Sequence, residues 1–167
     1  MSSTSSGSSR SRERPAARGC LRRRPAGAAG GRAAVAAVVR RQVEALNRRD
    51  LEALVALYAE DAVLEFPSSP AVRGREHIRR AFEGFFREWE EVVTLDALLV
   101  DGARVSAEGT VTGRHRTIHL RLPGRIPAAP RAYRHPFAAF WEVRDGRITR
   151  HRVYYDAREL VRQLLRG

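Results

Sequence analysis

The chain has 167 residues, and all 31 of its lysine-or-arginine positions are arginine, which against 19 acidic residues gives a formal net charge of +12. This length suits one domain whose core needs no disulfide or metal to hold it together. Cys20 is the only cysteine and no apolar run is long enough to cross a membrane. A disulfide within the chain and a membrane-spanning helix are therefore excluded, and we expect a cytoplasmic protein.

Residues 1–31 differ in composition from the rest, because they are rich in Arg, Ser and Gly and have no aromatic residue. Such a segment cannot bury enough apolar surface to offset the entropy lost on ordering. The sequence therefore predicts a disordered tail over residues 1–31 and a folded domain over residues 32–167. The arginines could form an arm for nucleic acid or anionic lipid, but without aromatic side chains for base stacking we favour a solvated extension. Nucleic-acid binding therefore ranks last among the candidate functions.

Three stretches of the first half have the apolar periodicity of helices. The first covers residues 33–47, and a short second helix follows Asp50, whose side chain is a suitable N-cap. The third begins near Arg75 and presents an aromatic stripe. Its apolar positions are Ile78, Phe82, Phe85 and Trp89. Between the second and third helices, residues 62–66 form a short run that is apolar except for Glu65 and is followed by Pro67, which predicts a short strand.

The second half is rich in strands. Residues 92–100 and 103–115 flank Asp101-Gly102, a pattern that predicts a hairpin. Small residues stand on the apolar face of the second of these strands, where they leave space and permit strong curvature. They are Ala107, Gly109 and Gly113. We therefore expect a curved sheet around a hollow.

The stretch from Phe137 to Asp156 predicts another hairpin, because two strand-like runs flank Asp145-Gly146. A three-residue loop would place Ala139 beside His151, whereas a two-residue loop would shift the register by one and place Ala138 beside Val153. Alternation along the strands gives one buried face. Its residues are His135, Phe137, Ala139, Trp141, Thr149, His151, Val153 and Tyr155.

The remaining segments complete the predicted order. Residues 117–131 contain several prolines and predict a loop, and residues 157–166 predict a short C-terminal helix. Helices come first and an antiparallel meander follows, so the class is α+β with helices on one face of a bent sheet.

Three segments, in order ALNRRDLEALVALYAEDAVLEFP, RGREHIRRAF and WEVRDGRITRHRVYYD, resemble the SnoaL-like branch of the nuclear transport factor 2-like superfamily. That group includes ketosteroid isomerases, aromatic polyketide cyclases and limonene epoxide hydrolases. The resemblance runs from about Ala33 to Leu165. It implies a cone-shaped α+β fold, in which a curved antiparallel sheet is wrapped by three helices and followed by a short C-terminal helix. It also implies a small hydrophobic ligand of polyketide or steroid type, no cofactor, and a homodimer formed through the sheets.

The catalytic positions implied by the resemblance hold other residue types here. Phe66 stands where ketosteroid isomerases have a general-base Asp before a proline, and Gln42 stands where they have a Tyr on the first helix. Ala139 occupies the position of the cyclases' pocket His, and Ala138 or Ala139 that of a second acid. Val153 stands two residues after His151, where cyclases have an Asp. A phenyl or alkyl group cannot exchange a proton, so known chemistries of the family are not matched.

The titratable residues expected on the inner face are His151, His135, His115 and Tyr155. His151 is the best placed of them and is the candidate catalytic residue. The remaining candidates form an expected ligand pocket. They are Gln42, Tyr58, Phe66, Trp89, His135, Phe137, Ala139, Trp141, Val153 and Tyr155. His115 and His119 would be about 13 Å apart on an extended chain, so no metal site is expected.

Two functions of different class remain open. The first is an isomerase, cyclase or hydrolase that uses His151 on a hydrophobic, ring-containing molecule. The second is a non-catalytic module for ligand binding or dimerisation, which the apolar residues at the family's acid positions favour.

Overall fold

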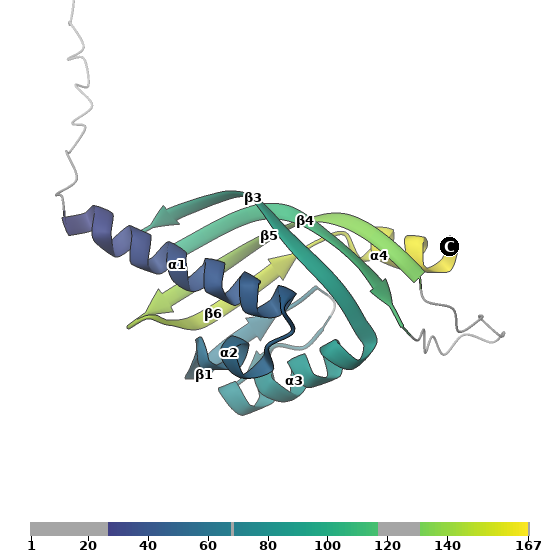
Figure 1. Ribbon diagram of the computed structural model, residues 1–167, viewed down its shortest axis with the longest axis horizontal. Helices are drawn as coiled ribbons and strands as arrows, with labels where there is room; N and C mark the ends of the chain where they lie inside the picture. The colour runs from purple at the N-terminus through teal and green to yellow at the C-terminus, as the bar shows by residue number, and fades with distance from the viewer. Residues whose placement is uncertain (1–26, 68, 117–130, 167) are drawn as a thin grey trace, which may run out of the picture.

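The computed structural model describes residues 27–67, 69–116 and 131–166 (Figure 1). The elements are α1 (Gly27–Asn47), α2 (Leu51–Ala56), β1 (Tyr58–Glu65), β2 (Val72–Arg73), α3 (Arg75–Glu88), β3 (Trp89–Asp101), β4 (Arg104–His115), β5 (Arg131–Arg144), β6 (Arg147–Tyr154) and α4 (Ala157–Arg166). Helix α1 begins at Gly27, inside the stretch assigned to the tail. Residues 1–26 and most of the loop predicted at 117–131 lie outside the described residues.

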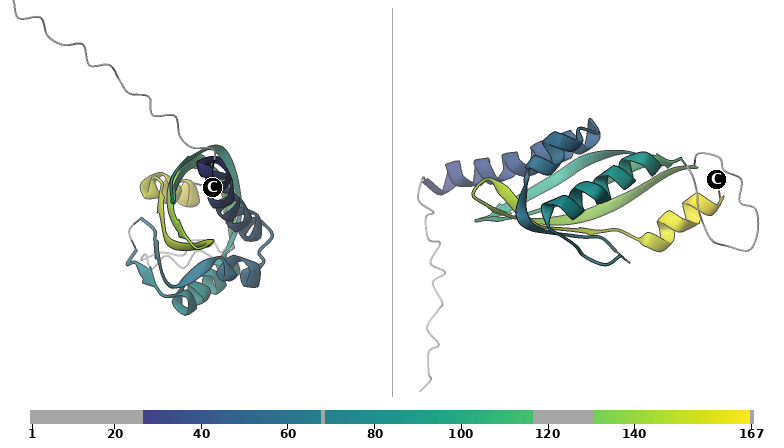
Figure 2. Two further views of the ribbon diagram at one scale, coloured as in Figure 1. Left: turned by 90° about the vertical axis from the view of Figure 1, so that its left-hand side faces the viewer. Right: turned by 90° about the horizontal axis from the view of Figure 1, so that it is seen from below.

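The six strands form one curved sheet in the order β2-β1-β6-β5-β4-β3. All neighbours are antiparallel except β1 and β6, which run parallel. Seen end-on in Figure 2, the sheet curls around α1, which packs against β3, β4 and β5. The predicted α+β class is confirmed, and the concave side of the sheet faces the helices.

The glycines of β4 allow the curvature but do not leave the hollow that was expected there. A Cβ built on Gly109 would lie 2.0 Å from the carbonyl oxygen of Thr94 and 2.9 Å from Phe137 Cε1. A Cβ on Gly113 would meet the Tyr133 hydroxyl at 2.6 Å. The space above each glycine is thus occupied by a neighbouring strand or by an aromatic ring. Glycine is needed here because backbone and rings approach closely.

The hairpin of β5 and β6 has a two-residue turn, so the predicted three-residue loop is wrong. Arg144 pairs with Arg147, and Asp145 and Gly146 have φ of 50° and 73°. Such positive φ values at both turn positions are typical of a type I′ hairpin.

A register shift follows the turn and corrects the predicted pairing further. Between the pairs Val143 with Ile148 and Glu142 with Arg150, Thr149 has no partner of its own. This bulge places Trp141 beside His151 and Ala139 beside Val153, where Ala139 beside His151 was expected. Beyond the bulge, the observed pairing differs from the predicted pairing by two residues. Side chains alternate with a period of two, so His151 and Val153 still lie on the predicted face. Before the bulge the face changes: Ile148 is fully buried in place of Thr149.

The turn between α1 and α2 fixes the edge strand β3. Asn47 Nδ2 donates to the carbonyl of Val93 at 2.9 Å, and the Val93 N–H donates to Asn47 Oδ1 at 2.8 Å. Arg49 donates to the carbonyl of Trp89 at 2.7 Å and lies over the ring of Phe86. These bonds satisfy backbone groups that an edge strand would otherwise leave unpaired. The predicted N-cap is also confirmed, since the Asp50 side chain accepts from the Ala53 N–H.

The core lies between the concave face of the sheet and the helices. Its largest fully buried side chains include Trp141, Tyr58, Leu54 and Ile78. In the described part of the chain, no helix has both the length and the apolar character that crossing a membrane requires.

Candidate ligand-binding site

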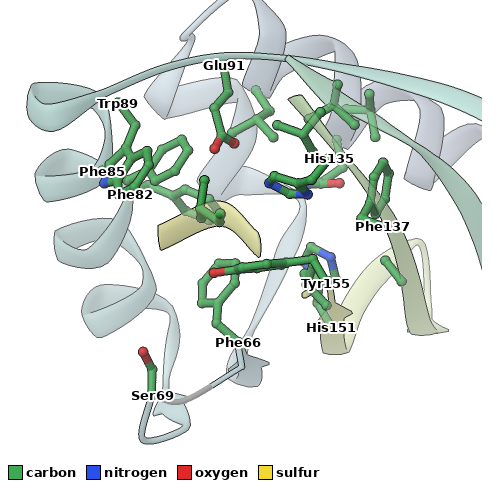
Figure 3. Close-up of a pocket in the computed structure, with 18 of the residues that line it drawn as sticks. Phe66, Ser69, Phe82, Phe85, Trp89, Glu91, His135, Phe137, His151 and Tyr155 are labelled. Carbon is green, nitrogen blue, oxygen red and sulfur yellow. The ribbon is translucent and has the colours of Figure 1, made fainter. Parts of the chain in front are cut away.

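A cavity of about 260 Å³ opens between the concave face of the sheet, α1, α3 and α4 (Figure 3). Its walls are mainly aromatic and aliphatic. The lining residues are Gln42, Val43, Leu46, Phe66, Ser69, Phe82, Phe85, Trp89, Glu91, Val93, Val111, His135, Phe137, Ala139, Trp141, His151, Val153, Tyr155 and Leu160. The aromatic stripe of α3 supplies Phe82 and Phe85, and Trp89 continues it as the first residue of β3.

The structure brings together ten of the eleven residues predicted for the site. Nine of the ten expected pocket residues line the cavity, and so does His151. Tyr58 does not line it: its side chain is fully buried behind His151. Phe66, Ala139 and Val153, which stand where the resemblance implies an acid or a histidine, all line the cavity, so those parts of the wall are apolar.

His151 is held by two neighbours. Its ring stacks on Trp141 with centroids 4.8 Å apart and planes at 18°, and its Nδ1 lies 2.9 Å from the Tyr58 hydroxyl. Burial lowers the pKa of His151 to about 3, because the charged imidazolium would lose its hydration there. The pKa of Tyr58 is raised by burial, and a hydrogen bond with Gln42 opposes this rise. His151 is therefore a neutral imidazole near neutral pH.

His135 lies on β5, on the same inner face of the sheet as Trp141. Its Nδ1 is 3.1 Å from the carbonyl oxygen of Pro136, which can only accept, so Nδ1 carries the proton. The ring lies between Tyr133 and Tyr155, with centroid distances of 5.9 and 4.9 Å. In its neutral form this tautomer leaves Nε2 as a hydrogen-bond acceptor.

Glu91 is the acidic residue of the cavity lining, and it was not among the residues predicted for the site. It is half-buried, and its carboxyl group points into the cavity in Figure 3. The Tyr133 hydroxyl donates a hydrogen bond to Glu91 Oε1. Burial raises the pKa of Glu91, and the hydrogen bond from Tyr133 only partly opposes this. Glu91 in turn raises the pKa of Tyr155, in addition to the larger effect of burial there.

The signal for Glu91 is alternation along β3. The predicted strand began at residue 92, which left Glu91 in a connection, whereas β3 begins at Trp89. Val93 is buried, and counting back in twos from it places Glu91 and Trp89 on the same inner face. Extending the strand by three residues would have identified an acid facing inward.

Metal ligands do not gather in the described part of the chain: no three His, Cys, Asp or Glu side chains there could hold an ion together. His115 is buried against the indole of Trp89, at 4.1 Å between ring centroids, and its Nε2 is 3.9 Å from Glu88 Oε2. His119 lies outside the described residues.

Comparison with known proteins identifies a family. The SnoaL-like domain family matches residues 39–151. A "putative polyketide cyclase" from Xanthomonas campestris pv. campestris is 31% identical, with a TM-score of 0.73 over 80% of this chain and 98% of that one. A second "putative polyketide cyclase", from Pseudomonas putida, is 28% identical, with a TM-score of 0.66 over 75% and 94% of the two chains.

An LEH-like epoxide hydrolase from M. tuberculosis is similar in fold. It is 24% identical, with a TM-score of 0.66 over 81% of this chain and 92% of that one. None of the curated proteins compared with the chain matches it.

Proposed function

This chain belongs to the SnoaL-like domain family, and on that basis we propose that its cavity binds a small hydrophobic molecule that contains rings. The observation that carries the proposal is the lining. Aromatic and aliphatic side chains form most of it, and it includes Phe66, Ala139 and Val153, which stand where the resemblance implies an acid or a histidine. Ligand sites of this kind bury apolar area and use a few polar groups for orientation.

The expected gain in binding free energy follows from the apolar surface area that the ligand buries. A bicyclic ring that loses about 250 Å² of apolar surface to the cavity gains roughly 6 kcal/mol before the costs of association. Polyketide-like and steroid-like molecules have this character, and the structural neighbours described as "putative polyketide cyclase" support that class.

The test is the affinity of a hydrophobic fluorescent probe for wild type and Val153→Asp. A carboxylate at position 153 would stand in a poorly solvated wall, and we expect the dissociation constant to rise at least about tenfold. Tyr154→Asp is the matched control, because Tyr154 is the next residue of β6 and its side chain is half exposed on the outer face of the sheet. It should bind the probe as wild type does.

Equal affinity in Val153→Asp and wild type would show that the probe does not occupy this cavity. A loss that is just as large in Tyr154→Asp would place binding on the outer face of the sheet. Either result contradicts the proposal.

Catalysis on the bound molecule is a second candidate, of isomerase, cyclase or hydrolase type. The likeness to proteins described as "putative polyketide cyclase" favours it. The catalytic role predicted for His151 stays a prediction. A histidine with a pKa of about 3 is a weak base near neutral pH, so its hydrogen bond to Tyr58 and its stacking on Trp141 favour a positioning role for its ring.

The homodimer also stays a prediction, together with the cytoplasmic location. The outer face of the sheet offers Phe140 and Tyr154, which are 42% and 50% exposed and pack edge to face on each other. Arg152 lies over the Phe140 ring. Aromatic residues with arginine are typical of interface cores. Sedimentation at high protein concentration should give the mass of two chains, and a single-chain mass would count against pairing.

A further inference from the structure

Charge in the cavity is distributed differently from charge in the rest of the chain. The chain as a whole has 31 arginines against 19 acids. Among the described residues, however, the cavity lining includes one acid, Glu91, and no arginine. A basic protein thus has a cavity whose single carboxyl group faces aromatic walls.

Glu91 differs from Glu90 and Glu65 in that no arginine among the described residues pairs with it. Its sequence neighbour Glu90 pairs with Arg116, and Glu65 accepts two hydrogen bonds from Arg150, at 2.8 and 3.0 Å. These arginines lower the pKa of both carboxyl groups. In the described part of the chain no arginine pairs with Glu91, and its one hydrogen bond comes from Tyr133. A buried carboxylate without a counter-charge is costly, and a cation brought by a ligand would remove that cost.

Aromatic rings surround the space into which the Glu91 carboxyl group points. Trp89 lies two residues before it on the same face of β3, and the Tyr133 ring stands edge-on to Trp89 at 5.6 Å. Phe85 stacks on Trp89 at 6.3 Å with planes at 9°. Figure 3 shows Phe82, Phe85 and Trp89 on one side of this space and His135 on the other. The faces of such rings attract cations, most strongly where water is excluded.

We propose that the cavity prefers a hydrophobic ligand that carries an ammonium group, with the ammonium bound between Glu91 and the aromatic rings of α3 and β3. This inference rests on the proposed function, since the ring system of the ligand occupies the apolar part of the cavity. Glu91 is the specificity-determining residue, and Tyr133 positions its carboxyl group. On binding, Glu91 is a carboxylate and the ammonium replaces the missing counter-charge; a protonated Glu91 releases its proton to solvent.

A preference for a cationic ligand is the opposite of what the overall charge of the protein favours. A net charge of +12 repels cations from the surface and attracts anions. A measured preference for an amine over an acid of the same skeleton would therefore report the local site and not the long-range field.

The experiment compares three probes that share one ring system: 2-(2-naphthyl)ethylamine, 2-(2-naphthyl)ethanol and 2-naphthylacetate. Calorimetric titrations at about pH 8 keep the amine protonated, as an alkylamine is with a pKa of about 10. Wild type should bind the amine at least about tenfold more tightly than the alcohol, and the acetate most weakly.

Glu91→Gln is the decisive variant, because glutamine keeps the shape and an acceptor for Tyr133 but removes the charge. We expect it to bind amine and alcohol within about threefold of each other while its affinity for the alcohol is retained or raised. Glu90→Gln is the matched control, since it makes the same chemical change at the exposed neighbour that pairs with Arg116. It should keep the preference of wild type.

The outcomes separate the two proposals. If wild type binds the alcohol as well as the amine, or if Glu91→Gln keeps the preference for the amine, the role of Glu91 is wrong while the apolar cavity stands. If none of the three probes binds, the proposed function fails and this inference fails with it.

Discussion

Gly109→Ala is expected to destabilise the domain by at least about 3 kcal/mol, a large fraction of the unfolding free energy of an ordinary domain. The added Cβ would lie 2.0 Å from the carbonyl oxygen of Thr94 and 2.9 Å from the Phe137 ring. Thr94 belongs to the paired strand β3, so its carbonyl cannot move without disturbing the ladder beside the cavity. Urea denaturation followed by circular dichroism measures the change.

Gly84→Ala is the matched control with the opposite expected sign. Gly84 lies inside α3, and a Cβ there would meet only the end of the Arg87 side chain, at 4.0 Å. Alanine favours a helix over glycine by up to about 1 kcal/mol, so this variant should be as stable as wild type or more stable. If Gly109→Ala were as stable as Gly84→Ala, β3 and β4 would not approach each other as described.

Acid should destabilise the domain through His151. Its pKa is about 6.5 in the unfolded chain and about 3 in the folded one, so between these values the unfolded state binds more protons. The contribution of His151 to the free energy of unfolding is therefore fully present above pH 6.5 and is lost as pH falls toward 3. Each pH unit well inside this window costs about 1.4 kcal/mol.

His151→Gln should remove this slope. The free energy of unfolding of wild type should fall by about 2 kcal/mol between pH 6 and pH 4.5, and the variant should change much less over the same interval. Carboxylates whose pKa values are lowered by arginine, such as Glu65, lose their contribution mainly at lower pH. His77→Gln, at a histidine exposed on α3, is the control and should keep the wild-type slope. An unchanged slope in His151→Gln would mean that His151 is accessible to water.

Patterns of burial predicted the fold well, because they depend on many residues at once. The stripe on α3 and the alternation along β4 and β5 each involve several apolar side chains, and the structure has these faces as expected. The pairing of β5 with β6 depended on one turn and one bulge. Composition predicts the turn at Asp145 and Gly146, but nothing in the local sequence marks Thr149 as the unpaired residue.

In the candidate site, too, features that depend on many residues were predicted and features that depend on one position were not. The apolar walls followed from the face of β5 and β6, whereas Glu91 was missed because the start of β3 was placed three residues late. An acid at a strand end is usually solvated, and only the packing of α3 and Tyr133 around it makes Glu91 part of a cavity. The role of Gly109 could not be predicted either, since the contact with Thr94 depends on the curvature of the finished sheet.

The most direct test of the central claim is the location of a bound ring compound, measured by the amide chemical shifts of the protein during titration with 2-(2-naphthyl)ethanol. The claim predicts the largest shifts at cavity-lining positions of three strands, such as Val93, Val111 and Val153. Leu99 and Phe140, which are exposed, should stay unchanged. Shifts centred on Phe140 and its outer-face neighbours, with none at the lining residues, would contradict the claim that this domain binds its ligand inside the cavity.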